Sequence, residues 1–277
     1  MIKKTASQPD KESPIGVFDS GIGGLTVARA IVRSLPNEHL VYFGDTAHLP
    51  YGDKSPQAIR HYAEGITHFL LERKCKAIVI ACNTASAHAF QTVKKMVNPN
   101  IPVLNVIDPV INHTAREFPG KKIGIIATKG TVSSGVYQKR LENKDKQIHA
   151  YTLATPLLVP VIEEDFMPRE VRLAILQAYL KQPGLQNLDA LILGCTHYPL
   201  MLKEIKETLP GNTVVIDSAT VTAKALEKLL VSKELLRTAA RKPRRDFFIS
   251  DYTPAFEKIA RKFFGDEIHL HKAKIWE

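Results

Sequence analysis

A chain of 277 residues is long enough for two ordinary domains. Its content of 44% hydrophobic and 24% charged residues is typical of soluble globular proteins and argues against a disordered or collagen-like chain. No apolar stretch approaches the roughly 20 residues that span a bilayer. Residues 1–13 are polar and lack the apolar run of a secretory signal, so we expect a flexible leader on a cytoplasmic protein without a membrane partner.

The net charge of +10 raises the question of a nucleic-acid partner. The densest basic run consists of Arg237, Arg241, Lys242, Arg244 and Arg245. Neither interleaved aromatic residues nor a zinc-finger spacing accompanies it, so we interpret it as a solvated linker between a helix and a last strand. A nucleic-acid-binding protein stays open as an alternative, which steeply salt-dependent DNA binding would support. A basic surface also speeds the encounter with an acidic small molecule.

Short apolar runs alternate with segments of helical periodicity along most of the chain. The runs predict strands at Ile15–Phe18, Leu40–Phe43, Ala77–Ala81, Val103–Ile107, Lys122–Ala127, His149–Leu153, Ala190–Leu193, Thr213–Ile216 and Asp246–Ile249. Between them, Pro56–Arg73 has apolar residues every three or four positions, with Ser55 as its N-cap and Pro56 in its first turn. Strands that alternate with helices of this length indicate an α/β protein with parallel sheets.

The second half of the chain repeats three landmarks of the first half in the same order. Ile15–Phe18 is similar to Ile123–Ile126, Ala77–Cys82 to Ala190–Cys195, and Val106–Asp108 to Val215–Asp217, at offsets of 108, 113 and 109 residues. We therefore predict two pseudo-symmetric parallel-sheet domains with flanking helices and an active site in the interdomain cleft. Residues 14–108 with 218–277 would form the first domain and residues 109–217 the second.

The three cysteines are too few and too dispersed for a disulfide framework. Cys82 and Cys195 each follow an apolar strand and precede a predicted helix, at equivalent positions of the repeat. We expect both thiols at the carboxyl edges of their sheets, near helix N-termini that lower a thiol pKa, and facing each other across the cleft. Cys75 has no counterpart in the other half, so we expect it to be buried and unreactive.

Two opposed thiols suit one reaction class in particular. Inversion of a stereocentre by proton exchange needs a base on one face of the substrate and an acid on the other, and the two exchange roles in the reverse reaction. A thiolate and a thiol meet this need without a cofactor or a metal. Backbone N–H groups at the two helix N-termini could bind the carboxylate next to the reacting carbon.

Four motifs around these cysteines resemble the aspartate/glutamate racemase superfamily. They are Phe18–Leu25, Tyr42–Thr46 with Pro50–Gly52, Ala81–Ala85 and Gly194–Leu200. The ending Thr196–Pro199 is most similar to the glutamate branch rather than to the aspartate and hydantoin branches. The resemblance implies interconversion of L- and D-glutamate by a homodimer, which supplies D-glutamate for peptidoglycan without pyridoxal phosphate or metal. A racemase of a related amino acid such as aspartate is the alternative within this class.

The resemblance also implies roles for single residues. Cys82 would deprotonate D-glutamate with the help of Asp19, and Cys195 would deprotonate L-glutamate with the help of His197. The substrate site would consist of Asp19, Ser20, Tyr51, Gly52, Asn83, Thr84, Thr196 and His197, with Thr128 and Thr131 nearby. Residues 160–165 resemble a family segment that usually ends in glycine. Asp165 departs from that pattern, so the roles of Glu163 and Glu164 stay open.

Three other interpretations of these motifs remain. Gly21–Thr26 follows the first strand, where a dinucleotide fingerprint would stand, but Thr26 replaces its third glycine, and we interpret the glycines as a tight turn beside the substrate. Cys82, Cys195 and His197 could hold zinc, although no fourth ligand is evident. A cysteine hydrolase would use Cys195 as nucleophile and His197 as base, which leaves Cys82 without a purpose.

Overall fold

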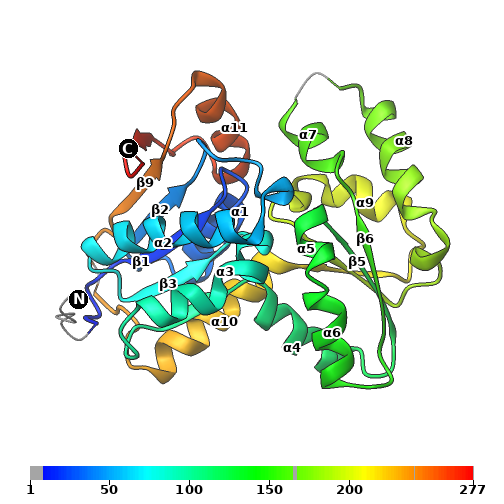
Figure 1. Ribbon diagram of the computed structural model, residues 1–277, viewed down its shortest axis with the longest axis horizontal. Coiled ribbons are helices and arrows are strands. Elements are labelled where there is room, and N and C mark those ends of the chain that lie inside the picture. The colour runs from blue at the N-terminus through cyan, green and yellow to red at the C-terminus, as the bar shows by residue number, and fades with distance from the viewer. Residues whose placement is uncertain (1–8, 165–166, 240, 277) are drawn as a thin grey trace.

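The computed structural model describes residues 9–164, 167–239 and 241–276, so Asp165 lies outside the described residues. Two separate parallel sheets stand side by side (Figure 1). The first has the order β10-β9-β2-β1-β3-β4 and consists of β1 (Ile15–Asp19), β2 (Leu40–Gly44), β3 (Ala77–Ile80), β4 (Val103–Asn105), β9 (Arg245–Ile249) and β10 (Leu270–Lys272). The second has the order β6-β5-β7-β8 and consists of β5 (Lys122–Ala127), β6 (His149–Ala154), β7 (Ala190–Gly194) and β8 (Val214–Asp217).

Helices flank both sheets and follow the strands as predicted for an α/β chain. They are α1 (Leu25–Ser34), α2 (Pro56–Glu72), α3 (Asn83–Met96), α4 (Ile107–Glu117), α5 (Lys129–Ser133), α6 (Val136–Lys144), α7 (Leu158–Glu163), α8 (Arg169–Leu180), α9 (Leu202–Thr208), α10 (Ser218–Ser232) and α11 (Pro254–Phe264). Short 3₁₀ turns lie at η1 (Tyr51–Asp53), η2 (Pro183–Leu185) and η3 (Tyr198–Met201). Ser55 caps α2 by accepting the Ala58 N–H at 3.2 Å, which confirms the predicted helix start. None of the helices among the described residues is long and apolar enough to cross a membrane.

The register of the strands confirms two of the three repeat landmarks. Ile15 of β1 pairs with Ala77 of β3, and Ile123 of β5 pairs with Ala190 of β7. The pair β1 and β3 of the first sheet and the pair β5 and β7 of the second therefore share one register, at the offsets that the sequence predicts. In both sheets the strand that carries a reactive cysteine at its end lies next to the first strand of its half.

The third landmark is wrong. Val215 and Ile216 lie in β8, whereas Val106 and Ile107 lie beyond β4, at the start of α4. The strand predicted at Val103–Ile107 ends at Asn105 because the Asn105 side chain accepts the N–H groups of the next turn and starts a helix there. Asp217 does the same for α10, so its structural counterpart is Asn105.

The last part of the chain returns to the first sheet, as the sequence analysis expected. β9 pairs with β2 in parallel, and β10, a strand that the sequence analysis missed, pairs with β9. α10 packs against α1 of the first half and also contacts β7 and β8 of the second. The expected domain boundary at residues 108 and 109 falls inside α4, and the two-domain division by residue number stays a prediction.

Both faces of the first sheet are buried, which explains why its strands are apolar runs rather than alternating ones. Ile15 and Val17 of β1 face a cluster that continues through α1 and α10 into the second sheet. Phe18, on the other face, joins a cluster with α2 and α3 that also contains Cys75, of which 2% is exposed. Cys75 is therefore a core residue.

The basic run differs from the expected solvated linker at Arg245, which is the first residue of β9, and at Arg237. Arg237 is only 3% exposed, and its guanidinium donates to the Glu12 carboxylate at 2.8 Å and to the Asn37 carbonyl at 2.6 Å. Its backbone N–H donates to the buried Glu38 carboxylate, which also pairs with buried Lys76. Arg237 thus ties the linker to the base of the first sheet, and through Glu12 it fixes the end of the expected leader.

Candidate active site

One small cavity of about 60 Å³ lies between the two halves and contains both predicted thiols. Its walls are formed by Ser20, Gly21, Ile22, Leu49, Pro50, Tyr51, Gly52, Cys82, Asn83, Thr84, Thr128, Val159, Glu163, Gly194, Cys195, Thr196 and His197. Every residue of the predicted site is in this lining except Asp19, which lies behind it. The structure therefore brings the predicted residues together, at the carboxyl edges of both parallel sheets.

Cys82 stands between the end of β3 and the start of α3 as the N-cap of that helix. Its sulfur accepts the Ala85 N–H at 3.4 Å, and its thiol donates to the Ser20 hydroxyl at 3.6 Å. Only 6% of Cys82 is exposed. Burial and the nearby Asp19 carboxylate raise the pKa of the Cys82 thiol to about 12, although the Ala85 and Ser20 contacts act in the other direction. Cys82 is therefore held as a neutral thiol.

Asp19, the last residue of β1, is fully buried beside Cys82. Its Oδ2 accepts the Gly21 N–H at 3.0 Å, whereas its Oδ1 has no hydrogen-bond partner among the described residues. Burial raises the pKa of Asp19, and the interaction with His197 and three backbone N–H groups opposes that rise. An unpaired buried carboxylate oxygen next to a cavity is suited to receive a cationic group or a proton.

Cys195 has a different set of neighbours. Its sulfur lies 3.7 Å from His197 Nδ1, and His197 Nε2 lies 2.8 Å from Glu163 Oε1 at the end of α7. Burial lowers the pKa of His197, but the contacts with Cys195 and Glu163 outweigh it and raise the value to about 10. His197 is therefore an imidazolium at neutral pH that donates to the sulfur on one side and to the carboxylate on the other.

One prediction about this half needs correction. No α-helix begins at Cys195, because η3 follows at Tyr198 and α9 begins only at Leu202. The sulfur therefore lacks the helix N-terminus that Cys82 has, and the His197 ring takes that place. The role of Glu163, which the sequence left open, is to hold His197, while Glu164 is exposed.

Neutral donors and acceptors cover much of the remaining wall. The Asn83 Oδ1 accepts the Tyr137 hydroxyl at 2.7 Å, which leaves its Nδ2 donor without a partner among the described residues. The hydroxyl groups of Thr84, Thr128 and Thr131 lie within 2.9 to 3.2 Å of one another. Thr84 and Thr128 line the cavity, whereas Thr131 supports them from behind. The Thr128 and Thr131 pair is therefore at the site, but only Thr128 faces it.

Tyr51 and Gly52 lie in the loop that closes the cavity on the side of the first sheet. The Tyr51 hydroxyl donates to Asp45 at 2.7 Å, and the Tyr51 side chain is 1% exposed. Because this hydroxyl is already paired, Tyr51 faces the cavity with its ring and main chain. Gly52 packs closely on Thr128, whose Cβ would lie 3.0 Å from an added Cβ.

The glycines after β1 make room for the side chains of His197 and Asp19. A Cβ on Gly23 would lie 2.3 Å from the His197 ring, and a Cβ on Gly24 would lie 2.4 Å from the Asp19 Cβ. Only Gly21 of the three lines the cavity itself. Gly23 and Gly24 therefore leave room for the His197 and Asp19 side chains. The tight turn beside the substrate stays a prediction for these glycines.

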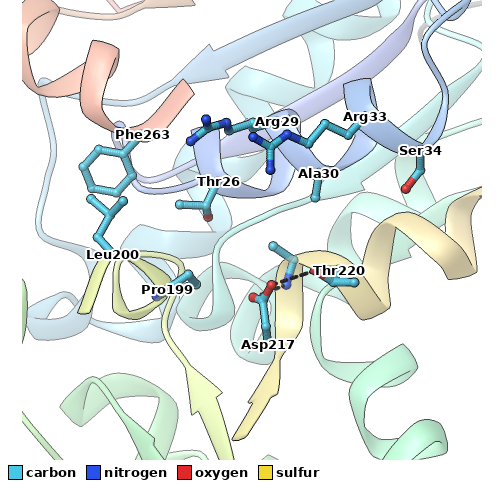
Figure 2. A pocket seen from close by; sticks show the side chains of 11 residues that line it. Thr26, Arg29, Ala30, Arg33, Ser34, Pro199, Leu200, Asp217, Thr220 and Phe263 are labelled. Carbon is cyan, nitrogen blue, oxygen red and sulfur yellow. Dashed lines mark hydrogen bonds between the residues drawn. The ribbon is translucent and has the colours of Figure 1, made fainter. Parts of the chain in front are cut away.

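A second, larger cavity of about 330 Å³ lies behind the site and contains neither thiol. Figure 2 shows Arg29 and Arg33 extending from α1 on one side of it and Asp217 and Thr220 at the start of α10 on the other. Thr26, on the same helix, donates from its hydroxyl to the Thr196 carbonyl at 2.8 Å. This bond joins α1 of the first half to the loop that carries Cys195.

Within the described parts of the chain, no group of three or more His, Cys, Asp or Glu side chains is placed to hold a metal ion. Among the described residues that line the thiol cavity, the only titratable charged side chains besides the cysteines are Glu163 and His197. The cavity can therefore combine two thiols, one imidazolium and several neutral hydrogen-bonding groups. This set is suited to proton transfer on a small polar molecule.

Comparison with known proteins agrees with this chemistry. The sequence profile described as Asp/Glu/Hydantoin racemase matches residues 15–226. The glutamate racemase of Geobacter metallireducens is 39% identical over 254 residues, which cover 92% of this chain and 93% of that protein. The glutamate racemase of Neisseria meningitidis serogroup A is 42% identical over 255 residues, which cover 92% and 94%.

A solved structure extends the similarity to the fold. The glutamate racemase of Francisella tularensis in complex with D-glutamate superimposes with a TM-score of 0.89 at 36% identity, over 96% of this chain and 98% of that chain. The match covers both parallel sheets and their flanking helices, so the predicted fold is confirmed. The chain therefore belongs to the Asp/Glu/Hydantoin racemase family of isomerases, and the three relatives named above are glutamate racemases.

Proposed function

We propose that this enzyme interconverts L- and D-glutamate by moving the α-proton between Cys82 and Cys195, without a cofactor. The observation that carries the proposal is that both sulfurs line one buried cavity, each from the carboxyl edge of a different sheet. Two acid–base groups that approach from different halves of the molecule can reach opposite faces of one carbon. The choice of glutamate is supported by two glutamate racemases, which this chain matches over 93% and 94% of their lengths.

The protonation states around the two sulfurs support a defined resting form. The raised pKa of Cys82, about 12, keeps that thiol protonated at neutral pH, and the raised pKa of His197, about 10, keeps the imidazolium beside Cys195. An imidazolium is the partner that stabilises a thiolate. With L-glutamate, Cys195 beside His197 would act as the base that takes the α-proton, and Cys82 would deliver a proton to the opposite face. D-glutamate reacts by the reverse path.

The free polar atoms of the cavity suit the other groups of an amino acid. A substrate carboxylate can accept hydrogen bonds from the Asn83 Nδ2 and from the first N–H groups of α3. The unpaired Asp19 Oδ1, behind the lining, can attract an ammonium group or hold a proton. Because no lysine or arginine occurs among the described lining residues, both carboxylates of glutamate would be held by neutral donors and by His197.

The test is incubation of the purified protein with L-glutamate in deuterated water without added cofactor. D-glutamate should appear, and at early times deuterium should be found at Cα of the product but not of the remaining substrate. That pattern is the signature of two different bases, because a single base would also return deuterium to the substrate. Aspartate is assayed in parallel, and a higher rate with aspartate, or no racemisation by folded protein, would overturn the proposal.

One observation favours a second candidate function. Cys195, His197 and Glu163 form a nucleophile–base–carboxylate chain like that of a thiol hydrolase. A hydrolase would accumulate an acyl-enzyme on Cys195 with ester or amide substrates and would work without Cys82. Mass spectrometry of the intact protein after incubation with p-nitrophenyl esters, for the wild type and Cys82→Ser, distinguishes the two functions. Turnover that survives loss of Cys82 would favour the hydrolase.

The wider biological expectations belong to this proposal as well. They are the supply of D-glutamate for peptidoglycan, a cytoplasmic location, a homodimer and the division of the chain into domains of residues 14–108 with 218–277 and 109–217. Light scattering behind a sizing column tests the homodimer, since one subunit has a mass of 30.9 kDa. Growth of a strain that depends on added D-glutamate, when this chain is expressed in it, tests the peptidoglycan role.

A further inference from the structure

The carboxylate of Asp45, directly after β2, is a buried junction between two distant parts of the chain. It is fully buried and accepts hydrogen bonds from the Tyr51 hydroxyl at 2.7 Å and the Ser250 hydroxyl at 2.8 Å. It also accepts one from the Trp276 indole N–H at 2.9 Å, and His48 Nδ1 lies 3.0 Å from it. A buried carboxylate requires such donors, because each missing one leaves a costly desolvated charge. Asp45 therefore joins the cavity loop of Tyr51 to the segment after β10.

The Trp276 side chain is built into the first half of the molecule. Its ring contacts His48 edge-on at 5.0 Å and Tyr62 edge-on at 5.6 Å. It fits against α2 because residue 65 is glycine, and a Cβ there would lie 2.6 Å from the indole. The segment after β10 is thus fixed by both packing and a hydrogen bond, and the hydrogen bond leads to Asp45.

The other side of the junction leads to the cavity. Tyr51 begins η1, and Leu49, Pro50, Tyr51 and Gly52 all line the space between the thiols and the loop. Among the described residues, Asp45 is the one hydrogen-bond partner of the Tyr51 hydroxyl. A shift of the Asp45 carboxylate would therefore move Tyr51 in the wall of the cavity. Cys82 and Cys195 are held by other elements.

We propose that Trp276 is a positioning residue, which acts through Asp45 and Tyr51 to hold the cavity loop in the shape that binds substrate. The proposal rests on the proposed function, since glutamate is taken as the occupant of the cavity. It predicts that loss of the indole N–H weakens substrate binding more than it slows the proton transfers. A purely structural role for Trp276 would instead lower stability and leave KM unchanged.

The first experiment compares Trp276→Phe with Ile275→Ala. Phenylalanine keeps an aromatic ring but has no N–H for Asp45. Ile275 packs against the same core cluster as Trp276, and its side chain has no group that could donate a hydrogen bond to Asp45. We expect Trp276→Phe to raise KM about tenfold with a smaller change in kcat, as for the loss of a hydrogen bond to a charged group. Ile275→Ala should lower the unfolding midpoint and leave KM unchanged. Equal KM values for wild type and Trp276→Phe would overturn the proposal, and so would an equal rise in KM for both variants.

The second experiment does not depend on turnover. Trp276 is the only tryptophan of the chain, so the tryptophan emission of the protein reports on this junction alone. Titration with D-glutamate should change the emission of the wild type, and Tyr51→Phe, which keeps Trp276 but cuts the link to Asp45, should lose that change. An emission that stays constant while racemisation saturates would overturn the proposal. Racemisation absent from a protein whose emission still responds would instead overturn the proposed function.

Discussion

Cys82 and Cys195 follow equivalent strands of the two sheets, yet different structures begin after them. Cys82 caps the long helix α3 and has Ser20 and Asp19 beside it. Cys195 enters the 3₁₀ turn η3 and has the His197 imidazolium, which Glu163 holds in place. The two halves thus place their sulfurs at equivalent positions but surround them with different neighbours. In a two-base exchange one group is an acid while the other is a base, and the raised pKa of Cys82 suits it to the acid role in one of the two directions.

The largest effect should come from removing either sulfur. Cys82→Ser and Cys195→Ser should each lower kcat/KM by about 10² to 10⁴-fold, because serine cannot exchange a proton at neutral pH. The remaining thiol can still act on one face. Cys82→Ser should therefore exchange the α-proton of L-glutamate with deuterated water, and Cys195→Ser that of D-glutamate, as followed by NMR. Exchange of the same enantiomer by both variants would contradict the assignment of the faces.

Cys75 provides the matched control for both variants. It is buried in the core, and burial raises the pKa of its thiol to about 12. Cys75→Ser should lower stability but keep wild-type racemisation and show no enantiomer-specific exchange. A folded Cys75→Ser protein as inactive as the other two would show that the pairing of Cys82 with Cys195 is wrong.

The next effect tests the imidazolium on the Cys195 side through its pH dependence. The pKa of His197 is raised from 6.5 to about 10, so the charged ring and the stability it contributes are fully present below about pH 6.5 and are lost as the pH rises towards 10. Above that pH, kcat/KM should fall equally for both enantiomers, because the equilibrium constant of a racemisation is one. Glu163→Gln removes one of the contacts that raise this pKa, so the fall should move to lower pH.

Glu164→Gln is the control for this shift. Glu164 is the next residue along the chain, is exposed and does not line the cavity. Its pH profile of kcat/KM should match that of the wild type. If the pH profile of Glu163→Gln also matched that of the wild type, the contact between Glu163 and His197 would not set the pH at which kcat/KM falls.

Two adjacent glycines allow each side of the site to be disturbed separately. An alanine at Gly23 would press on His197, and an alanine at Gly24 would press on Asp19, at 2.3 and 2.4 Å. Each should cost about 1 to 3 kcal/mol of unfolding free energy in urea, as overpacking does. Gly23→Ala should also move the alkaline fall of kcat/KM, whereas Gly24→Ala should lower kcat/KM without moving it.

Gly211→Ala is the matched control, since an added Cβ there meets nothing within 4 Å. It should change neither stability nor the pH profile. An alkaline fall that moved in Gly24→Ala but not in Gly23→Ala would reverse the proposed roles of the two sides.

The sequence predicts the scaffold of this site better than its asymmetry. The apolar strands that precede Cys82 and Cys195 follow from local patterns, and so does the similarity of the two halves. Val106–Asp108 shares letters with Val215–Asp217, but the Asn105 side chain ends β4 earlier, and a match of three residues does not reveal that. The turn after Cys195 was not predicted either. The Tyr198 N–H donates to the Cys195 carbonyl, and α9 begins only at Leu202.

Contacts across long stretches of chain could not be predicted. Glu163 reaches His197 from 34 residues away, and Trp276 reaches Asp45 from 231 residues away. Neither pair carries a spacing that marks it, because both depend on how whole elements pack. The resemblance to a family supplied most of the residues that line the cavity and Asp19 behind them. The role of Glu163, which also lines it, and the link from Trp276 to Asp45 became visible only in three dimensions.

The smallest effect concerns the bond that ties the two halves behind the site. Thr26→Val removes the hydroxyl that donates to the Thr196 carbonyl at 2.8 Å, at a cost of about 0.5 to 1.5 kcal/mol. Because Thr196 stands next to Cys195, a small fall in kcat/KM should accompany it. Thr67→Val is the matched control: its buried hydroxyl donates to the Ala63 carbonyl within α2, away from the cavity. That variant should lose similar stability in urea and keep its kcat/KM. Equal kcat/KM values for the two variants would mean that α1 supports the fold but not the Cys195 loop, and the asymmetry would then reside in His197 and Glu163 alone.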